Sequence, residues 1–453
     1  MLSQNENKLL CHTGPGTPMG KLFRRFWLPV ALSRELPKPD CPPVRLRILS
    51  EDLVGFRDTS GRVGLLARHC PHRGASLFFG RNEEGGLRCV YHGWKFDVTG
   101  SCVDMPNEPA DCSFKDKIRQ TAYPTREAGG VIWAYMGPNA TMPELPQLEW
   151  TLVPQNHVCV HKRFQHCNYL QNVEGEVDSS HVSFLHREFR PEKFEAAIAG
   201  QVLLARAKDS APKFFVEETQ YGLAIAARRN WDADHYYWRL TQFLMPSFTL
   251  IPSEAGSPIN FTAAVPVDDM NMVGFTVTWL ADRPMSREDI RVIESWTGAC
   301  AEVDPKTFEP VANRANDYLI DREKQRSENF TGMRGIREED IAVQEDQHGG
   351  PIADRTKEHL GASDAGVIAL RRRLLKAARD VQAGKELPEP RCAGAYRVRA
   401  NANLVGCEIS FNEVVRSTLP KSSAKSEPDS ARRKPRQEKC GIEMARSAAS
   451  NFD

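Results

Sequence analysis

The stretch of sequence that decides the fold is RHCPHRGASLFFGRNEEGGLRCVYHGWKFD, residues 68–97. It holds two short loops, and each loop offers one thiol and one imidazole: Cys70 with His72, and Cys89 with His92. Sixteen residues separate the two pairs. Two thiolates and two imidazoles suit either a tetrahedral zinc ion or a two-iron, two-sulfide cluster that has both histidines on one iron. The pattern therefore predicts a metal centre.

The residues around these four ligands favour the cluster over zinc. Zinc sites typically use C-x-x-C pairs, whereas the pairs here are C-P-H-R-G and C-V-Y-H-G-W, which closely resemble the Rieske iron–sulfur motif. The resemblance implies that the four residues hold a [2Fe-2S] cluster. The respiratory-chain type carries an extra cysteine in each loop, and Ala75 and Tyr91 stand in those places. The motif thus indicates the oxygenase or ferredoxin type, and we interpret His69 as a bystander.

Composition limits the class of partner and the compartment. The chain has 453 residues, of which 41% are apolar, and its net charge is +1 from 60 basic and 59 acidic residues. A chain with so little net charge has no strong positive electrostatic field that would attract nucleic acid or an anionic membrane. The polar start lacks a signal core, and no apolar run reaches the roughly 18 residues of a membrane helix. We expect a cytoplasmic protein whose 12 cysteines are reduced thiols or metal ligands.

The residue pattern predicts an α+β chain in four parts. Residues 1–40 form a segment that packs on the catalytic domain, and 41–145 form the all-β Rieske [2Fe-2S] domain. Its alternating stretch 44–70 turns at Asp58–Gly61. Residues 146–417 form a domain with an antiparallel sheet covered by helices, which the resemblance implies is a helix-grip, START-like fold. Residues 418–453 are polar and predict a disordered tail.

Within the second domain, the segment from Arg163 to His186 is mostly helix-permissive. In residues 214–230, 235–253 and 259–281 apolar and polar side chains alternate, which predicts paired strands of a sheet. The clearest helix begins after a cap at Ser363 or Asp364 and ends at Gly384. Its apolar face is predicted to hold five residues: Val367, Leu370, Leu374, Ala378 and Val381.

A second constellation lies in EGEVDSSHVSFLHRE, residues 174–188. Its D-x-x-H-x-x-x-x-H pattern resembles the mononuclear iron motif of Rieske non-haem iron oxygenases. The resemblance implies an Fe(II) facial triad with ligands His181 and His186. On a regular helix these two lie about 140° apart around the axis. We therefore predict a π-bulge or a helix break near Ser183–Leu185.

The third iron ligand must come from elsewhere in the chain. REEDIAVQED, residues 337–346, offers several acids. The family pattern E-D-x-x-V-x-E points to Asp340, and Asp346 is the alternative. We expect most of the other acids in this cluster to be solvated.

The resemblance assigns Asp178 a catalytic role between the two metal centres. It implies that Asp178 accepts hydrogen bonds from His181 and from the residue equivalent to His92 in a neighbouring subunit. Such an arrangement implies a homotrimer, and trimers can stack into a hexamer. The alternative is an acid in the first turn of a helix, stabilised by the helix dipole.

The resemblance covers residues 1–415 and is closest to the phthalate dioxygenase type. It implies a [2Fe-2S] cluster, mononuclear Fe(II) and O2. It also implies a separate reductase that carries flavin and a plant-type iron–sulfur cluster and oxidises NADH or NADPH.

The implied substrate is an aromatic carboxylate such as phthalate, and the implied product is a cis-dihydrodiol. Alternatives are another aryl carboxylate, a diaryl ether such as phenoxybenzoate, or an arylsulfonate, with hydroxylation or O-demethylation in place of dioxygenation. A Rieske electron carrier without catalysis, or a zinc protein, are alternatives of another class.

A dianionic substrate requires cations in its pocket, because bidentate arginine suits carboxylates. The candidate arginines are Arg206, Arg228, Arg229 and Arg239. We favour Arg239, a lone charge in the apolar strand YYWRLTQF, together with Arg206, and we expect Ser179 to be a hydroxyl donor. The alternative for each arginine is a surface position on a strand.

Overall fold

The computed structural model describes residues 2–109, 111–189, 204–294 and 300–419. Most of the predicted tail, 420–453, lies outside the described residues, whereas Thr418 is buried and its hydroxyl accepts a hydrogen bond from Gln242. None of the described helices is long and apolar enough to cross a membrane.

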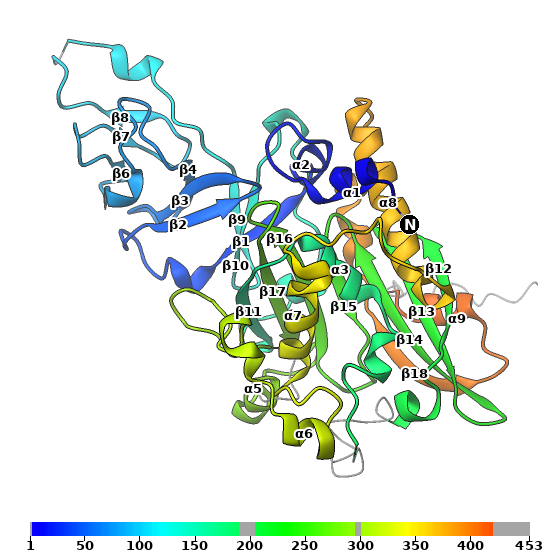
Figure 1. Ribbon diagram of the computed structural model, residues 1–453. Coiled ribbons are helices and arrows are strands. Elements are labelled where there is room, and N and C mark those ends of the chain that lie inside the picture. The colour runs from blue at the N-terminus through cyan, green and yellow to red at the C-terminus, as the bar shows by residue number, and fades with distance from the viewer. Residues whose placement is uncertain (1, 110, 190–203, 295–299, 420–453) are drawn as a thin grey trace, which may run out of the picture. The chain divides into compact units, whose positions relative to one another are not determined.

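Small antiparallel sheets form the N-terminal third of the chain (Figure 1). One sheet has the order β2 (Val44–Ile48), β3 (Glu51–Arg57), β4 (Val63–Ala67). The next has the order β5 (Arg81–Glu83), β6 (Gly86–Arg88), β7 (Lys95–Phe96), β8 (Cys102–Asp104). The predicted hairpin is confirmed, because β3 and β4 pair across a turn in which Gly61 has φ 82°. These sheets surround a core of their own that includes Phe56, Leu66 and Trp94.

A third sheet joins this region to the rest of the chain. Its order is β1 (Trp27–Leu32), β10 (Val131–Tyr135), β9 (Thr125–Ala128). Every residue of β1 and β10 is buried, in the same core as the large C-terminal sheet. The preceding helices are α1 (Gln4–Cys11) and α2 (Pro18–Phe23). The carbonyls of Leu10 and Cys11 accept hydrogen bonds from Tyr169 and Asn168, so the N-terminal segment is tied to the later domain.

The C-terminal domain is built on an eight-stranded antiparallel sheet. In sheet order its strands are β11 (Val158–Gln165), β17 (Met272–Trp279), β16 (Ile259–Pro266), β15 (Phe248–Ile251), β14 (His235–Leu244), β13 (Gly222–Asn230) and β12 (Lys213–Glu218), with β18 (Asn401–Gly406) also paired to β14. The predicted strands are confirmed. The helix-permissive interpretation from Arg163 is wrong for its first residues, because β11 runs to Gln165 and pairs along its whole length with β17. That pairing is a tertiary contact, which local propensity does not contain.

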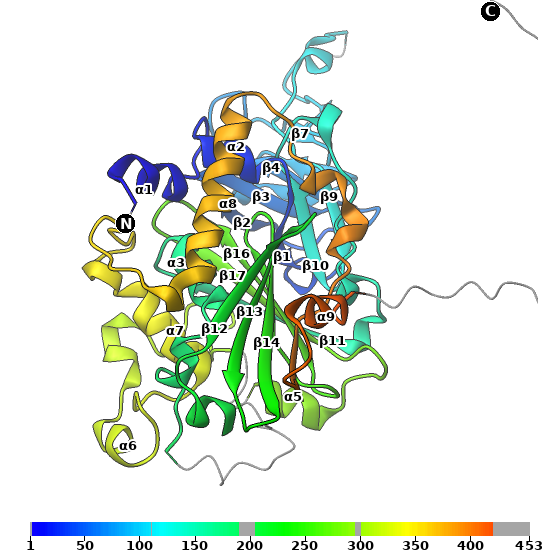
Figure 2. The same ribbon diagram turned by 90° about the vertical axis from the view of Figure 1, so that its right-hand side faces the viewer.

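Helices cover the sheet (Figures 1 and 2). The helices of this domain are α3 (Tyr169–Val177), α5 (Arg287–Ile293), α6 (Arg322–Ser327), α7 (Ile336–Glu345), α8 (Ala365–Gln382) and α9 (Phe411–Arg416), of which α3, α8 and α9 contact the strands. The predicted long helix is confirmed as α8, with all five predicted apolar residues buried. Asp364 stands at its N-cap position, but its side chain accepts from the Gly361 N–H and makes no capping hydrogen bond to the helix. Helix α9 packs on the opposite face of β13 and β14, in a cluster with Trp238. The predicted α+β class, an all-β domain followed by a helix-covered antiparallel sheet, is confirmed.

Candidate active site

The two cysteine loops are built as a matched pair of turns. In the first, the Gly74 N–H donates to the Cys70 carbonyl at 2.9 Å and the Cys70 N–H donates to Ala75 at 2.8 Å. In the second, the Gly93 N–H donates to Cys89 at 3.0 Å and the Cys89 N–H donates to the fifth residue on, Trp94, at 2.8 Å. The two glycines have φ 75° and 78°, a conformation that glycine adopts without strain. Each loop therefore presents its cysteine and histidine in the same way.

The side chains of these loops fit a cluster. Cys70 and Cys89 are each 2% exposed, and burial together with the nearby Cys89 thiol raises the pKa of Cys70 to about 11. The His72 and His92 rings lie 4.4 Å apart between centroids, and His72 stacks on Trp94 at 4.3 Å. Among the described residues, nothing hydrogen-bonds the buried Nδ1 of His92. An iron bound at that nitrogen would satisfy it, so the donor set fits a [2Fe-2S] cluster. The ring of His69 instead faces the Gly74 carbonyl at 2.9 Å, as expected for a bystander.

The second constellation begins where α3 ends. The helix stops at Val177, Asp178 is its C-terminal cap, and a 3-10 turn follows at His181–Ser183. The predicted π-bulge or break near Ser183–Leu185 is wrong in its position, since the helix has already ended before His181. The alternative for Asp178, an acid in the first turn, is wrong as well, because the residue lies at the C-terminal end of a helix. The two histidines can approach each other because the chain leaves the helix before His181.

Three potential ligand atoms converge here. The Nε2 atoms of His181 and His186 lie 3.2 Å apart, and Asp340 Oδ1 on α7 lies 3.7 Å and 3.2 Å from them. Ligand atoms about 2.1 Å from a metal and at right angles to one another lie about 3.0 Å apart. Two imidazoles and one carboxylate at these separations fit a facial triad. The alternative ligand, Asp346, is 69% exposed and pairs with Arg314.

Each of the two histidines is oriented by a different carboxylate. Asp178 Oδ2 lies 3.3 Å from His181 Nδ1, and its Oδ1 accepts from the Ser180 N–H at 2.6 Å. The contacts with His181 hold the pKa of Asp178 below its usual value although burial opposes this. Glu339 Oε2 lies 2.6 Å from His186 Nδ1, in a fully buried contact. Burial lowers the pKa of His186, but Asp340 and Glu339 outweigh it and raise that pKa.

Three arginines gather beside this centre. Arg229 is fully buried, and its Nη2 donates to the Ser179 carbonyl at 2.5 Å. Arg239 lies on the neighbouring strand β14, and Arg206 completes the set; no described residue hydrogen-bonds the buried Nε of either one. Burial and the Arg239 charge lower the pKa of Arg206 to about 9 and that of Arg229 to about 10. We call Arg206, Arg229 and Arg239 the arginine cluster.

Strand alternation separates Arg228 from the arginine cluster. Arg229 is paired across the strands with Tyr237, and Arg239 with Ala227, so these arginines share one face of the sheet. Arg228 is paired with Trp238 and lies 3.9 Å from the Tyr236 ring centroid, on the opposite face. Arg228 is therefore no part of this site, whereas the other three candidates, Arg206, Arg229 and Arg239, remain.

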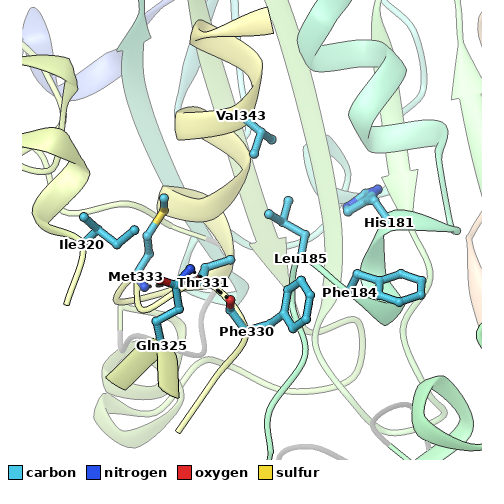
Figure 3. Close-up of a pocket in the computed structure, with 9 residues that line it drawn as sticks. All are labelled: His181, Phe184, Leu185, Ile320, Gln325, Phe330, Thr331, Met333 and Val343. Carbon is cyan, nitrogen blue, oxygen red and sulfur yellow. Dashed lines mark hydrogen bonds between the residues drawn. The ribbon is translucent and has the colours of Figure 1, made fainter. Parts of the chain in front are cut away.

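An apolar pocket of about 440 Å³ opens beside His181. Its lining comes from the turn after α3 and from the segment around α6 and α7 (Figure 3): His181, Phe184, Leu185, Ile320, Gln325, Phe330, Thr331, Met333 and Val343. Phe184, Phe330 and Val343 are each more than 40% exposed. The partly exposed Asp178 adjoins this pocket through His181.

Sequence reasoning placed the cysteine loops, both histidines and Asp340, and the structure brings each set together. It gave no role to Arg337, and its expectation that most of the other acids in residues 337–346 are solvated is wrong, because Glu338, Glu339 and Glu345 are buried. The signal for Glu339 was its position beside Asp340 in the E-D pair, but only the packing of α7 on the turn shows which histidine it reaches.

The chain is similar to known proteins in both of its parts. Residues 26–124 match the family described as "Rieske [2Fe-2S] domain", and residues 134–415 match "LigXa C-terminal domain like". The phthalate 4,5-dioxygenase oxygenase subunit of Pseudomonas putida is 41% identical over 85% of this chain and 88% of its own. The 3-chlorobenzoate-3,4-dioxygenase oxygenase subunit of Comamonas testosteroni is 39% identical over 86% of this chain and 91% of its own. The crystal structure of dicamba monooxygenase bound to dicamba has the same fold, with a TM-score of 0.57 at 18% identity, over 80% of this chain and all of that one.

Proposed function

Since this chain belongs to the Rieske non-haem iron oxygenases, as an oxygenase subunit, we propose that it dioxygenates an aromatic carboxylate of the phthalate type. The observation that carries the substrate class is the arginine cluster. The names of the two relatives above also specify aromatic carboxylates. The expected product is a cis-dihydrodiol.

The arginine cluster supports a carboxylate because, within the described part of the chain, no acid forms an ion pair with any of its three guanidinium groups. Buried guanidinium groups without a paired acid are costly, and a bound anion relieves that cost. In our proposal Arg239 and Arg206 bind the substrate carboxylates, and Arg229 holds Ser179 in place through its backbone carbonyl. The ring then lies between the cluster and the histidine turn.

The two metal centres divide the work. Cys70, His72, Cys89 and His92 hold the [2Fe-2S] group, and His181, His186 and Asp340 hold the iron. When bound, these groups supply the electron transfer and the oxygen chemistry. The protein side chains orient the substrate by its carboxylates and keep the histidine rings fixed through Asp178 and Glu339.

Electrons must pass from one centre to the other. In Figure 1 the strands that flank the second cysteine loop, β6 and β7, lie well away from α3 and α7. We propose that the chain is a homotrimer in which the His92 loop of one subunit reaches Asp178 of the next. Tyr91 and Val90, each more than half exposed beside His92, are then matched to the apolar pocket beside His181. Asp178 is the catalytic link between His92 and His181.

A separate reductase completes the system in this proposal. It carries flavin and an iron–sulfur cluster, oxidises NADH or NADPH, and works with the chain in the cytoplasm. The described cysteines form no disulfide, which supports a reducing compartment.

Product analysis tests the proposal. The purified protein, with a reductase of this type and NADH, is given phthalate, chlorobenzoate, phenoxybenzoate and an arylsulfonate, each beside its neutral ester or amide. We expect oxygen uptake and a cis-diol from a carboxylate and little from its neutral ester. Turnover of neutral rings in preference to carboxylates would overturn the substrate class. Iron analysis distinguishes a catalytic oxygenase from the electron-carrier alternative, because about three irons per chain are expected for catalysis and about two for a carrier.

A further inference from the structure

Arg337 is a buried arginine beside the metal-facing carboxylate of Asp340. It lies in the first turn of α7, is 4% exposed, and is one helical turn before Asp340. Its Nη1 lies 2.5 Å from Glu176 Oε1 on α3 and 3.5 Å from Asp340 Oδ2. The guanidinium therefore spans the two helices that carry Asp178 and Asp340.

The two oxygens of Asp340 have different surroundings. Oδ1 faces both histidine Nε2 atoms, whereas Oδ2 is turned toward Arg337. A carboxylate that is held at one oxygen by a cation presents the other oxygen to a metal. We propose that Arg337 is a positioning residue that makes Asp340 a one-oxygen ligand. The proposal rests on the iron site of the proposed function and goes beyond it.

The consequence is an additional open coordination position. Two histidines and one single-oxygen carboxylate leave three of six positions open. If Asp340 used both oxygens, two would remain. Arg337 thus keeps room beside the metal for small ligands.

The local charges support a fixed orientation. Arg337 and the buried Arg163 both lie near Glu176 and Asp340. Arg163 is held by the Thr276 hydroxyl at 3.1 Å and adds positive charge beside Arg337. Because Arg337 is shared, Asp340 Oδ2 cannot swing toward the metal without giving up an ion pair.

The test uses cobalt, since X-ray absorption at the cobalt edge ignores the iron of the cluster. The mononuclear site of the full chain is emptied with a chelator and loaded with Co(II). Replacing Arg337 alone would leave the buried Glu176 carboxylate without its ion-pair partner. The informative variant is therefore R337Q/E176Q, which removes both charges. E176Q is the matched control, because it keeps the contact between Arg337 and Asp340.

We expect R337Q/E176Q to show one additional oxygen neighbour at about 2.1 Å from cobalt, with E176Q and R337K like the wild type. An unchanged spectrum in the double variant would overturn the role of Arg337. The same change in E176Q alone would also overturn it, since the effect would then come from the packing of α3. If the wild type binds no cobalt, the iron site itself fails, and this proposal fails with it.

Discussion

The two metal-binding regions of this chain are assembled in opposite ways. All four residues of the cluster loops lie within residues 70–92, and each loop is a closed turn with its own hydrogen bonds. The mononuclear site takes two residues from the turn after α3 and a third from α7, more than 150 positions later in the sequence. The comparison teaches that a local site is specified by its own backbone, whereas a distributed site depends on how two helices pack.

The largest expected effect comes from removing a ligand of the distributed site. His186→Ala should abolish turnover while leaving the cluster intact, because the two sites share no residue. Iron per chain should fall by one, and the visible absorption of the cluster should remain. The control is His166→Ala, an exposed histidine that contacts Asn271 and Glu309. Loss of the cluster absorption in His186→Ala would show that the two regions are not independent.

The link between the regions is tested by Asp178→Asn. The variant keeps the size of the side chain but removes the charge that orients His181. We expect both metal centres to be retained and turnover to fall about 100-fold, with slow oxidation of the reduced cluster in single-turnover experiments. A rate of cluster oxidation close to that of the wild type would refute the bridging role.

The substrate side of the distributed site is tested by Arg239→Gln against Arg228→Gln. A charge-assisted hydrogen bond contributes about 1.5–3 kcal/mol, so kcat/KM for a carboxylate should fall about 10- to 100-fold in Arg239→Gln. Arg228 lies on the other face of the sheet, and its variant should stay within about twofold. Equal losses in both variants would remove the arginine cluster from the site.

The smallest effect distinguishes the two cluster loops from each other. Both glycines have positive φ, which costs alanine about 1–2 kcal/mol. A Cβ at Gly74 would meet nothing within 4 Å, whereas a Cβ at Gly93 would lie 2.6 Å from Pro106 Cγ. Gly93→Ala should therefore lower the unfolding temperature more than Gly74→Ala, followed by loss of cluster absorption on heating. Equal shifts would mean that Pro106 moves aside freely.

Several features could be predicted from the sequence because their cause is local. The turn at Asp58–Gly61, the apolar face of α8 and the paired cysteine loops depend on residues close together in the chain, and all three are present. The failures are equally physical. Strand β11 was missed because its partner β17 lies more than a hundred residues away. The expected helical bulge was wrong because the chain leaves the helix at Val177 instead of distorting it.

The sequence by itself determined which residue types can hold the metals and which family the chain resembles, because these motifs consist of ligand residues only a few positions apart in the chain. Only the tertiary structure decided that Arg229 rather than Arg228 joins Arg239, because strand pairing selects the face. It also decided that Glu339 contacts His186 and that Arg337 lies 3.5 Å from one oxygen of Asp340. These contacts join segments that are distant in the chain, and they exist only once α3, α7 and the sheet have packed together.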